Sequence, residues 1–181
     1  MQKELILSGF GGQGALFAGT LLAFTGLESG RHVTWIPSYG PEMRGGTAHC
    51  TVIVADEEIG SPVVRHPSGA IVMNIPSLER YEPLVRPGGT LIVNSSLVDR
   101  APQRTDIASR MIPGNAIAEE LGDKRMANMV LLGAYLAVEP LFTLEEVGRS
   151  LERHIPAHRR SLLQPNLEAL RRGAEAARQP S

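Results

Sequence analysis

The sequence predicts an α/β fold with three layers, in which helices cover both faces of a mostly parallel β-sheet. Short apolar segments alternate with segments of helical periodicity in the first half of the chain, the order of elements typical of such folds. Hydrophobic residues make up 43% of the 181 residues but aromatic residues only 4%, so the expected core is aliphatic, as in a sheet buried on both faces. Helical patterns cluster toward the C-terminus.

The first half of the chain supplies the strands. An apolar segment over 4–8 stops at glycines and predicts a buried first strand, and the apolar spacing that follows predicts a helix over 13–29, ended by Gly30. The second strand is expected to end at Pro37, which cannot donate a hydrogen bond to a neighbouring strand. The remaining elements of this half are strands over 32–37, 48–55, 70–74 and 90–94, and a helix over 77–85.

The second half supplies helices. Asn115 is a candidate cap for a helix through Leu121, with Gly122 just past its end. A buried, apolar helix is expected over 124–138. Thr143 and Glu146 form a capping-box pattern, which begins a helix that runs to His154 and is broken by Pro156. The last helix is polar and is expected over 157–177, with Pro165 as a candidate bend.

The chain shows no internal repeat and no long linker, so we expect a single domain over 1–181 with a C-terminal helical segment at about 143–178. A formal net charge of −1 gives no reason to expect nucleic-acid binding. The first residues run into a strand without the apolar stretch of a signal peptide, and no segment is long and apolar enough for a membrane span. The expectation is a soluble cytoplasmic protein without a membrane partner.

Cys50 is the only cysteine, so the chain can form no internal disulfide. It also cannot hold an iron–sulfur cluster alone, because the common clusters take about four thiolates. Cys50 lies in an apolar strand and is interpreted as a core residue. His154 and His158 have the spacing of a helical metal site, but Pro156 between them breaks the helix, so no metal site is expected. The C-terminal arginines are interpreted as a solvated or partner-facing surface.

A glycine loop joins the first strand to the first helix. Gly9, Gly11 and Gly14 match the G-x-G-x-x-G pattern, with Gly12 and Gln13 between them. Glycines let the backbone turn sharply and approach a ligand, and the positive end of the helix attracts an anion. The sequence therefore predicts a ligand-binding or active-site loop at Gly9–Gly14.

Two alternatives to that reading stay open. A nicotinamide-binding site needs an acidic residue at the end of the second strand to hold the ribose, and that strand ends in Pro37 and Ser38 instead. The glycines could also serve only the close packing of strand and helix. The loop is therefore an anion-binding loop, the phosphate-binding loop of a stand-alone nucleotide- or NAD-binding protein, or a purely structural turn.

A second glycine-rich segment follows the second strand, where open α/β sheets place their ligand crevices. Arg44 lies between glycines and could grip a carboxylate or phosphate through its planar guanidinium. Glu42 could orient Arg44, and Tyr39 is a residue type favoured in interfaces. The alternative is a structural turn whose charges face water, with Tyr39 closing the edge of the core. The expected partner-facing or coenzyme-facing residues are Tyr39, Gly40, Pro41, Glu42, Arg44, Gly45 and Gly46.

These two segments together, with the Asn128–Val130 stretch that leads to Gly133, resemble the γ subunit, or γ domain, of 2-oxoacid:ferredoxin oxidoreductases. The resemblance covers nearly the whole chain and includes the pyruvate, 2-oxoglutarate and ketoisovalerate enzymes. It implies a partly Rossmann-like α/β/α domain that supports the oxidative decarboxylation of a 2-oxoacid to an acyl-CoA, with electrons passed to ferredoxin. Among the substrates 2-oxoglutarate is preferred, although no feature of the chain selects it.

The resemblance also implies a division of labour. No catalytic residue and no metal ligand is assigned to this chain alone, and it is expected to bind no cofactor by itself. Thiamine diphosphate, magnesium and iron–sulfur clusters would be held by α, β and ferredoxin-like δ partner subunits, with coenzyme A as co-substrate. Two copies of the chain per complex are expected.

Overall fold

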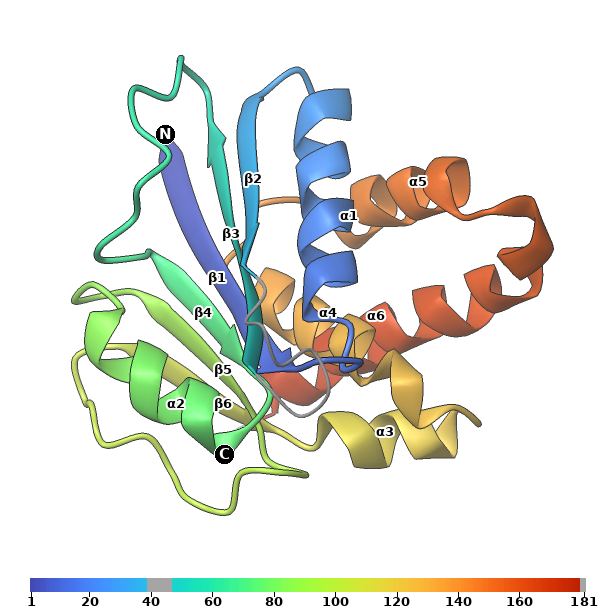
Figure 1. The fold of residues 1–181 in the computed structure, drawn as a ribbon. Helices are drawn as coiled ribbons and strands as arrows, with labels where there is room; N and C mark the ends of the chain where they lie inside the picture. The colour runs from blue at the N-terminus through green and yellow to red at the C-terminus, as the bar shows by residue number, and fades with distance from the viewer. Residues whose placement is uncertain (39–46, 180–181) are drawn as a thin grey trace.

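The computed structural model describes residues 1–38 and 47–179, and its centre is a mixed six-stranded sheet (Figure 1). The strands lie in the order β2-β3-β1-β4-β5-β6. Only β3 runs antiparallel to its neighbours, because it pairs antiparallel with both β1 and β2 while the other pairs are parallel. The strand bounds are β1 Gln2–Phe10, β2 His32–Ser38, β3 Thr47–Ala55, β4 Gly69–Val72, β5 Thr90–Asn94 and β6 Ala108–Ile112.

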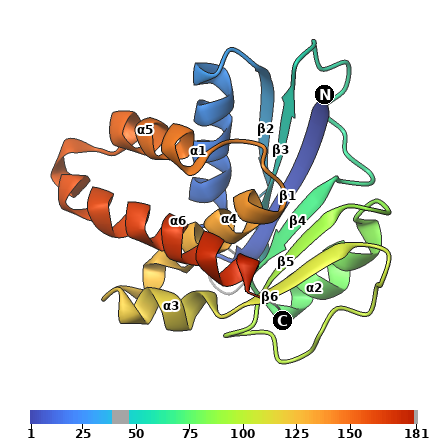
Figure 2. The same cartoon turned by 180° about the vertical axis from the view of Figure 1, so that it is seen from behind.

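Helices cover both faces of the sheet, so the predicted three-layer α/β architecture is confirmed (Figures 1 and 2). One face carries α1, α4, α5 and α6, with α3 beside them, and the opposite face carries α2. The helix bounds are α1 Ala15–Glu28, α2 Ile75–Tyr81, α3 Gly114–Glu120, α4 Ala127–Val138, α5 Leu144–His154 and α6 Leu163–Arg178, and short 3₁₀ turns occupy Glu82–Leu84, Lys124–Met126 and Ala157–Leu162.

The alternation of side chains along β1 explains why it reads as a continuous apolar run. Leu5 and Leu7 belong to the larger core beneath α1 and α4, whereas Ile6 belongs to the smaller core beneath α2. Successive side chains of a strand point to opposite faces, so a strand covered on both sides must be apolar at every position. β1 therefore lies in the middle layer, with helices packed on both of its faces.

α4 and α6 pack closely because each contributes a glycine that lies against the backbone of the other helix. A Cβ atom at Gly133 would overlap the carbonyl group of Leu170, and one at Gly173 would overlap that of Val130. Small residues let helix backbones approach in this way. The last helix is therefore no isolated polar helix: its Ala169, Leu170 and Ala174 side chains are buried against α4.

Several boundaries differ from the sequence expectation, each for a local reason. The second strand continues to Ser38, because Pro37 lies on the edge strand β2, where a missing N–H is tolerated. Pro113, and not Asn115, occupies the N-cap position of α3. Pro165 lies in the first turn of α6, where proline fits a helix, so it marks a beginning and no bend.

Other local predictions are confirmed. Thr143 and Glu146 form the full capping box at the start of α5, and Gly122 follows α3 with a positive φ of 95°. The edge strand β6 was not expected, since Ser109 and Arg110 interrupt its apolar pattern. Within the described residues, no helix is long and apolar enough to cross a membrane.

Candidate functional site

The connections that follow β1 and β4 go to opposite faces of the sheet. This arrangement makes the carboxyl ends of the two strands the expected place for a ligand. The chain leaves β1 for α1 on one face of the sheet and leaves β4 for α2 on the other (Figure 1). β1 and β4 are parallel neighbours, with Ser8 opposite Val72, so their carboxyl ends lie side by side. Open α/β sheets bind ligands in the crevice that opens at such a switch point.

The loop Gly9–Gly14 lies at this edge, between β1 and α1, as the sequence predicts. Gly12 and Gly14 have φ values of 92° and 80°, a left-handed region in which only glycine is unstrained. The backbone N–H of Gln13 donates to the carbonyl of Phe10 at 3.1 Å. The Phe10 N–H in turn donates to the Gln13 side-chain oxygen at 2.6 Å. Gln13 therefore holds the loop in shape from within.

The glycines of this loop divide into two groups. Gly9 and Gly14 approach other elements closely: a Cβ at Gly9 would lie 2.9 Å from the Met73 Cβ, and one at Gly14 would overlap the Asn128 side chain. Gly11 and Gly12 are exposed, and a Cβ at Gly12 would meet nothing within 4 Å. Close packing therefore requires glycine at Gly9 and Gly14. Gly11 and Gly12 remain exposed and accessible to a ligand.

The N-terminus of α1 opens toward this exposed part of the loop. Gly14 occupies the N-cap position, and no side chain caps the first turn. The first N–H groups of a helix have no partners within the helix, and together with the helix dipole they favour an anion. The loop can therefore receive a phosphate or carboxylate group.

Buried asparagines line the adjacent strand ends. Asn74 follows β4 and caps α2 by accepting a hydrogen bond from the Ser77 N–H at 2.9 Å, while its buried Nδ2 group has no partner within the described residues. Asn94 ends β5, and its Nδ2 donates to the Asn115 side-chain oxygen at 2.8 Å while its Oδ1 accepts from the Gly114 N–H at 3.1 Å. Through these contacts Asn74 holds the start of α2, and Asn94 holds the start of α3, at this edge of the sheet.

Four exposed apolar side chains come from segments that begin or end at this edge. Phe10 ends β1, Phe17 lies in the first turns of α1, Ile75 begins α2, and Leu97 follows β5. Each is at least 36% exposed. Large apolar side chains grouped at one edge are typical of a surface that another molecule covers. We call these four residues the apolar rim.

His49 and Arg80 stand on the α2 side of this edge. The His49 ring lies 5.6 Å from the ring of Tyr81, and the guanidinium of Arg80 lies 5.3 Å from that same ring. Burial, and secondarily the charge of Arg80, lowers the pKa of His49 below its usual value of 6.5. His49 is therefore neutral at pH 7 and can exchange hydrogen bonds as a neutral imidazole.

The second predicted segment, Tyr39, Gly40, Pro41, Glu42, Arg44, Gly45 and Gly46, lies outside the described residues. Its flanking residues are placed, however. Ser38 ends β2 opposite His49, and Thr47 begins β3 opposite Phe10. The two residues that flank it, Ser38 and Thr47, therefore lie at the same edge of the sheet as the end of β1.

The strand order argues against a nicotinamide site. A dinucleotide fold places its second strand beside the first, with an acidic residue at its end to hold the ribose. Here the antiparallel β3 lies between β1 and β2, and β2 ends in Ser38. The first glycine loop thus occurs without the neighbouring strand that the nucleotide reading requires.

The remaining candidates from the sequence have structural roles. Cys50 is fully buried, and this burial raises the pKa of its thiol to about 12, which disfavours the thiolate that iron–sulfur clusters need. His154 pairs with Glu28 at 2.9 Å and stacks on Phe24, whereas His158 lies in the following 3₁₀ turn. Among the described residues, no three His, Cys, Asp or Glu side chains form a metal-binding group.

Sequence reasoning missed Asn74, Asn94 and Asn128 as site residues. The signal was present for the first two, because both predicted inner strands end in asparagine, in the segments IVMN and LIVN. Asn128 lies at the start of α4, where its Nδ2 donates to the Gly14 carbonyl at 3.1 Å. No local pattern announces that contact, since it joins distant parts of the chain.

The fold and this edge define a class of protein: an α/β/α domain with an exposed glycine loop at the carboxyl edge of its central sheet. The sequence matches the family described as POR, pyruvate ferredoxin/flavodoxin oxidoreductase, over residues 4–176, and the chain belongs to this family.

Two relatives and one solved structure illustrate how far the similarity extends. The ketoisovalerate oxidoreductase subunit VorA of Methanothermobacter marburgensis is 36% identical over 95% of this chain, although the chain spans only 36% of that relative's length. The 2-oxoglutarate synthase subunit KorC of Methanocaldococcus jannaschii is 32% identical over 99% of this chain and 96% of its own length. A solved keto/oxoacid ferredoxin oxidoreductase γ subunit from Geobacter sulfurreducens superposes with a TM-score of 0.82 at 26% identity, covering 97% of this chain and 98% of its own.

Proposed function

We propose that this chain is the γ-type subunit of a multi-subunit 2-oxoacid:ferredoxin oxidoreductase. The complex oxidatively decarboxylates a 2-oxoacid, transfers the acyl group to coenzyme A and passes two electrons to ferredoxin. The observation that carries the proposal is the end-to-end match to KorC, because a separate subunit of this size exists among relatives of the family. α, β and ferredoxin-like δ chains are its partners, in a cytoplasmic complex with two copies of each.

The division of labour follows from what this chain's residues can do. Its single cysteine is buried and protonated, so electron transfer through a cluster falls to partner chains. Thiamine diphosphate with magnesium, held by those partners, supplies the decarboxylation chemistry. This chain supports the active site and the assembly.

The glycine loop gives this chain a direct contribution to the coenzyme A approach. Gly11 and Gly12 are exposed beside the uncapped N-terminus of α1, and phosphate groups suit such a site. The apolar rim follows the same edge of the sheet as the loop, so a partner that covers the rim would shield the loop from water. Arg44, between the placed residues Ser38 and Thr47, is the second candidate anion ligand.

For the 2-oxoacid we favour 2-oxoglutarate over ketoisovalerate. KorC matches this chain over its whole length as a separate subunit, whereas VorA matches with about a third of its length. Chain organisation is the only support for this choice, since no residue described in the crevice distinguishes the two acids.

The test is a pull-down of the chain from its own anaerobically prepared extract, followed by an assay of 2-oxoacid- and coenzyme A-dependent reduction of a viologen dye. Co-purification of larger chains with this activity supports the subunit assignment, and the preferred acid identifies the enzyme. Recovery of the chain alone with NAD bound, or with NAD-dependent turnover, would refute it.

A further inference from the structure

A cavity lies at the β6 edge of the sheet, the opposite edge from β2, between β6, α3 and the C-terminal half of α6. Its volume is about 470 Å³, within the range of small-molecule sites. The strand β5 separates β6 from β4, so this cavity is distinct from the crevice at the β1–β4 switch point. It is lined by Arg110, Met111, Ile112, Pro113, Ile117, Arg172, Glu175, Ala176 and Gln179.

Arg110 brings a positive charge into this cavity in a fixed orientation. Its Nη1 donates to the Ser109 carbonyl at 2.8 Å, and its Nε donates to the Ala177 carbonyl at 3.3 Å. No carboxylate lies within 4 Å of its guanidinium in the described part of the chain. The backbone contacts thus hold the guanidinium without neutralising it.

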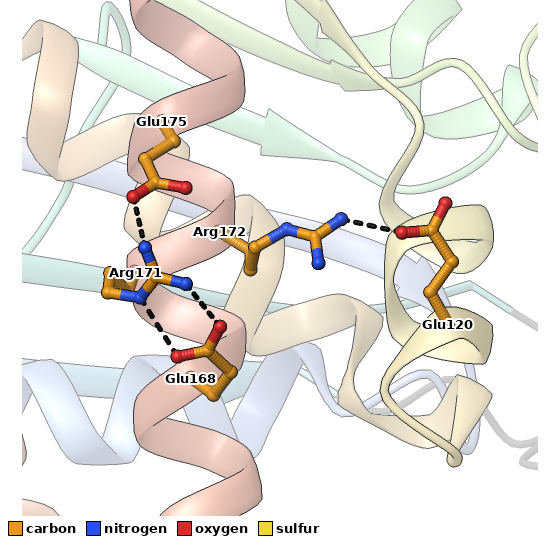
Figure 3. A network of polar contacts seen from close by, with 5 residues as sticks. All are labelled: Glu120, Glu168, Arg171, Arg172 and Glu175. Carbon is orange, nitrogen blue, oxygen red and sulfur yellow. Dashed lines mark hydrogen bonds and ion pairs between the residues drawn. The ribbon is translucent and has the colours of Figure 1, made fainter.

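Arg172 approaches the cavity from α6. Figure 3 shows its guanidinium extended toward Glu120 of α3, and its Nη2 donates to that carboxylate at 2.6 Å. Glu175, the acidic residue of the lining, pairs instead with Arg171, which also holds Glu168. The acidic side chains near the cavity are therefore already engaged, and within residues 1–38 and 47–179 none of them pairs with Arg110.

Apart from Gln179, the rest of the lining is formed by residues with apolar side chains. Ile112 and Ile117 are buried, and Pro113 and Ala176 extend this hydrophobic wall beside the two guanidinium groups. An arginine can bind a carboxylate through two parallel hydrogen bonds, while the apolar wall favours a hydrocarbon body over a bare inorganic ion. Both features point to one kind of ligand.

We propose that this cavity binds a small organic carboxylate with an aliphatic body, held by Arg110 and Arg172 against Ile112 and Ile117. Such a ligand would join β6, α3 and α6, and it would bind without occupying the carboxyl-edge crevice. The site is therefore suited to an effector and is independent of the function proposed above.

The experiment is an NMR titration of the full chain labelled at isoleucine methyl groups, with sodium isovalerate as the probe. Ile112 and Ile117 report on the cavity, and Ile53 of β3 serves as a remote reference. We expect saturable shifts at the two cavity residues with isovalerate and none with isovaleramide, which has the same shape without the charge. Absence of saturable shifts at millimolar isovalerate, or equal shifts with the amide, would overturn the proposal.

Two variants and a control locate the binding. Arg110→Gln and Arg172→Gln should each weaken isovalerate binding by about tenfold or more, because a hydrogen bond to a charged group is lost. Arg153→Gln, on α5 and outside the cavity lining, should leave the affinity unchanged. A titration with inorganic phosphate separates a general anion site from the proposed one: equal binding of phosphate would contradict the requirement for an aliphatic body.

Discussion

The side-chain amide of Asn128 lies 3.1 Å from the carbonyl oxygen of Gly14 and donates a hydrogen bond to it. This contact ties the beginning of α4 to the beginning of α1, across 114 positions of the sequence. The Asn128 Oδ1 also accepts from the Met129 N–H at 2.9 Å, so the amide is used at both ends. The glycine loop is thereby anchored to the most buried helix of the domain.

Replacing Asn128 with alanine should lower the free energy of unfolding by about 0.5–1.5 kcal/mol, because the partly buried Gly14 carbonyl loses one donor and keeps only the Ala18 N–H. Urea denaturation of the isolated chain measures the change. Asn166→Ala is the matched control, since Asn166 bonds only to the Leu162 carbonyl of its own turn and is half-buried. Equal losses in both variants would contradict the anchoring role.

Replacing Gly133 with alanine should destabilise the domain by about 4 kcal/mol or more, or prevent folding, because the new methyl group would overlap the Leu170 backbone. A backbone carbonyl cannot rotate away as a side chain could, so α4 and α6 would have to separate. Circular dichroism and thermal unfolding report the effect.

Gly60→Ala provides the control for this prediction. A Cβ at Gly60 meets nothing within 4 Å and its φ is not positive, so the change should stay within about 0.5 kcal/mol. A folded Gly133→Ala chain with wild-type stability would show that the two helices can move apart freely.

The contact at Gly133 also shows what a sequence can and cannot predict about this fold. The apolar composition of 124–138 predicts a buried helix, and the structure confirms α4 there. Which helix covers it depends on a contact with Leu170, far along the chain, and local periodicity carries no such information. The last helix was therefore interpreted as polar, although its inner side packs on α4.

The candidate site was predictable to a similar extent. The position of Gly9–Gly14 between a strand and a helix is confirmed, because turn chemistry is local. The insertion of β3 between β1 and β2 was not predictable, since an apolar strand pattern does not specify its neighbours. That insertion decides against the dinucleotide geometry more strongly than the missing acidic residue does.

The buried thiol of Cys50 predicts a pH dependence of stability. Its pKa is raised from 9.0 to about 12 by burial, so the folded state keeps the proton that the unfolded state loses above pH 9. Its contribution is fully present below pH 9 and is lost as the pH rises from 9 to about 12. Between about pH 8 and pH 10, the wild type should lose about 1.4 kcal/mol more than Cys50→Ala.

Urea unfolding of the two proteins at both pH values measures this difference. Using the difference cancels the titration of lysines and tyrosines, which both proteins share. An identical pH dependence in the two chains would mean that the thiol ionises as readily in the folded state as in the unfolded one.

Arg44→Ala should reduce coenzyme A-dependent turnover or assembly of the purified complex, because an anion would lose its guanidinium partner. The thermal unfolding of the isolated chain should change little. Arg44→Lys tests whether the charge alone is sufficient, since lysine keeps the charge but cannot form the paired hydrogen bonds of a guanidinium. If the Arg44→Ala complex assembles and turns over as the wild type does, Arg44 has no part in the site.

The two left-handed glycines of the first loop allow packing and ligand binding to be separated. Alanine at either position suffers a backbone strain of about 1–2 kcal/mol. Gly14→Ala also overlaps Asn128, whereas Gly12→Ala meets no neighbouring atom. Gly14→Ala should therefore be the less stable chain by at least about 1 kcal/mol, while Gly12→Ala should mainly raise the KM for coenzyme A in the complex, because its methyl group occupies the exposed side of the loop. A wild-type KM in the Gly12→Ala complex would leave the loop with packing as its whole role.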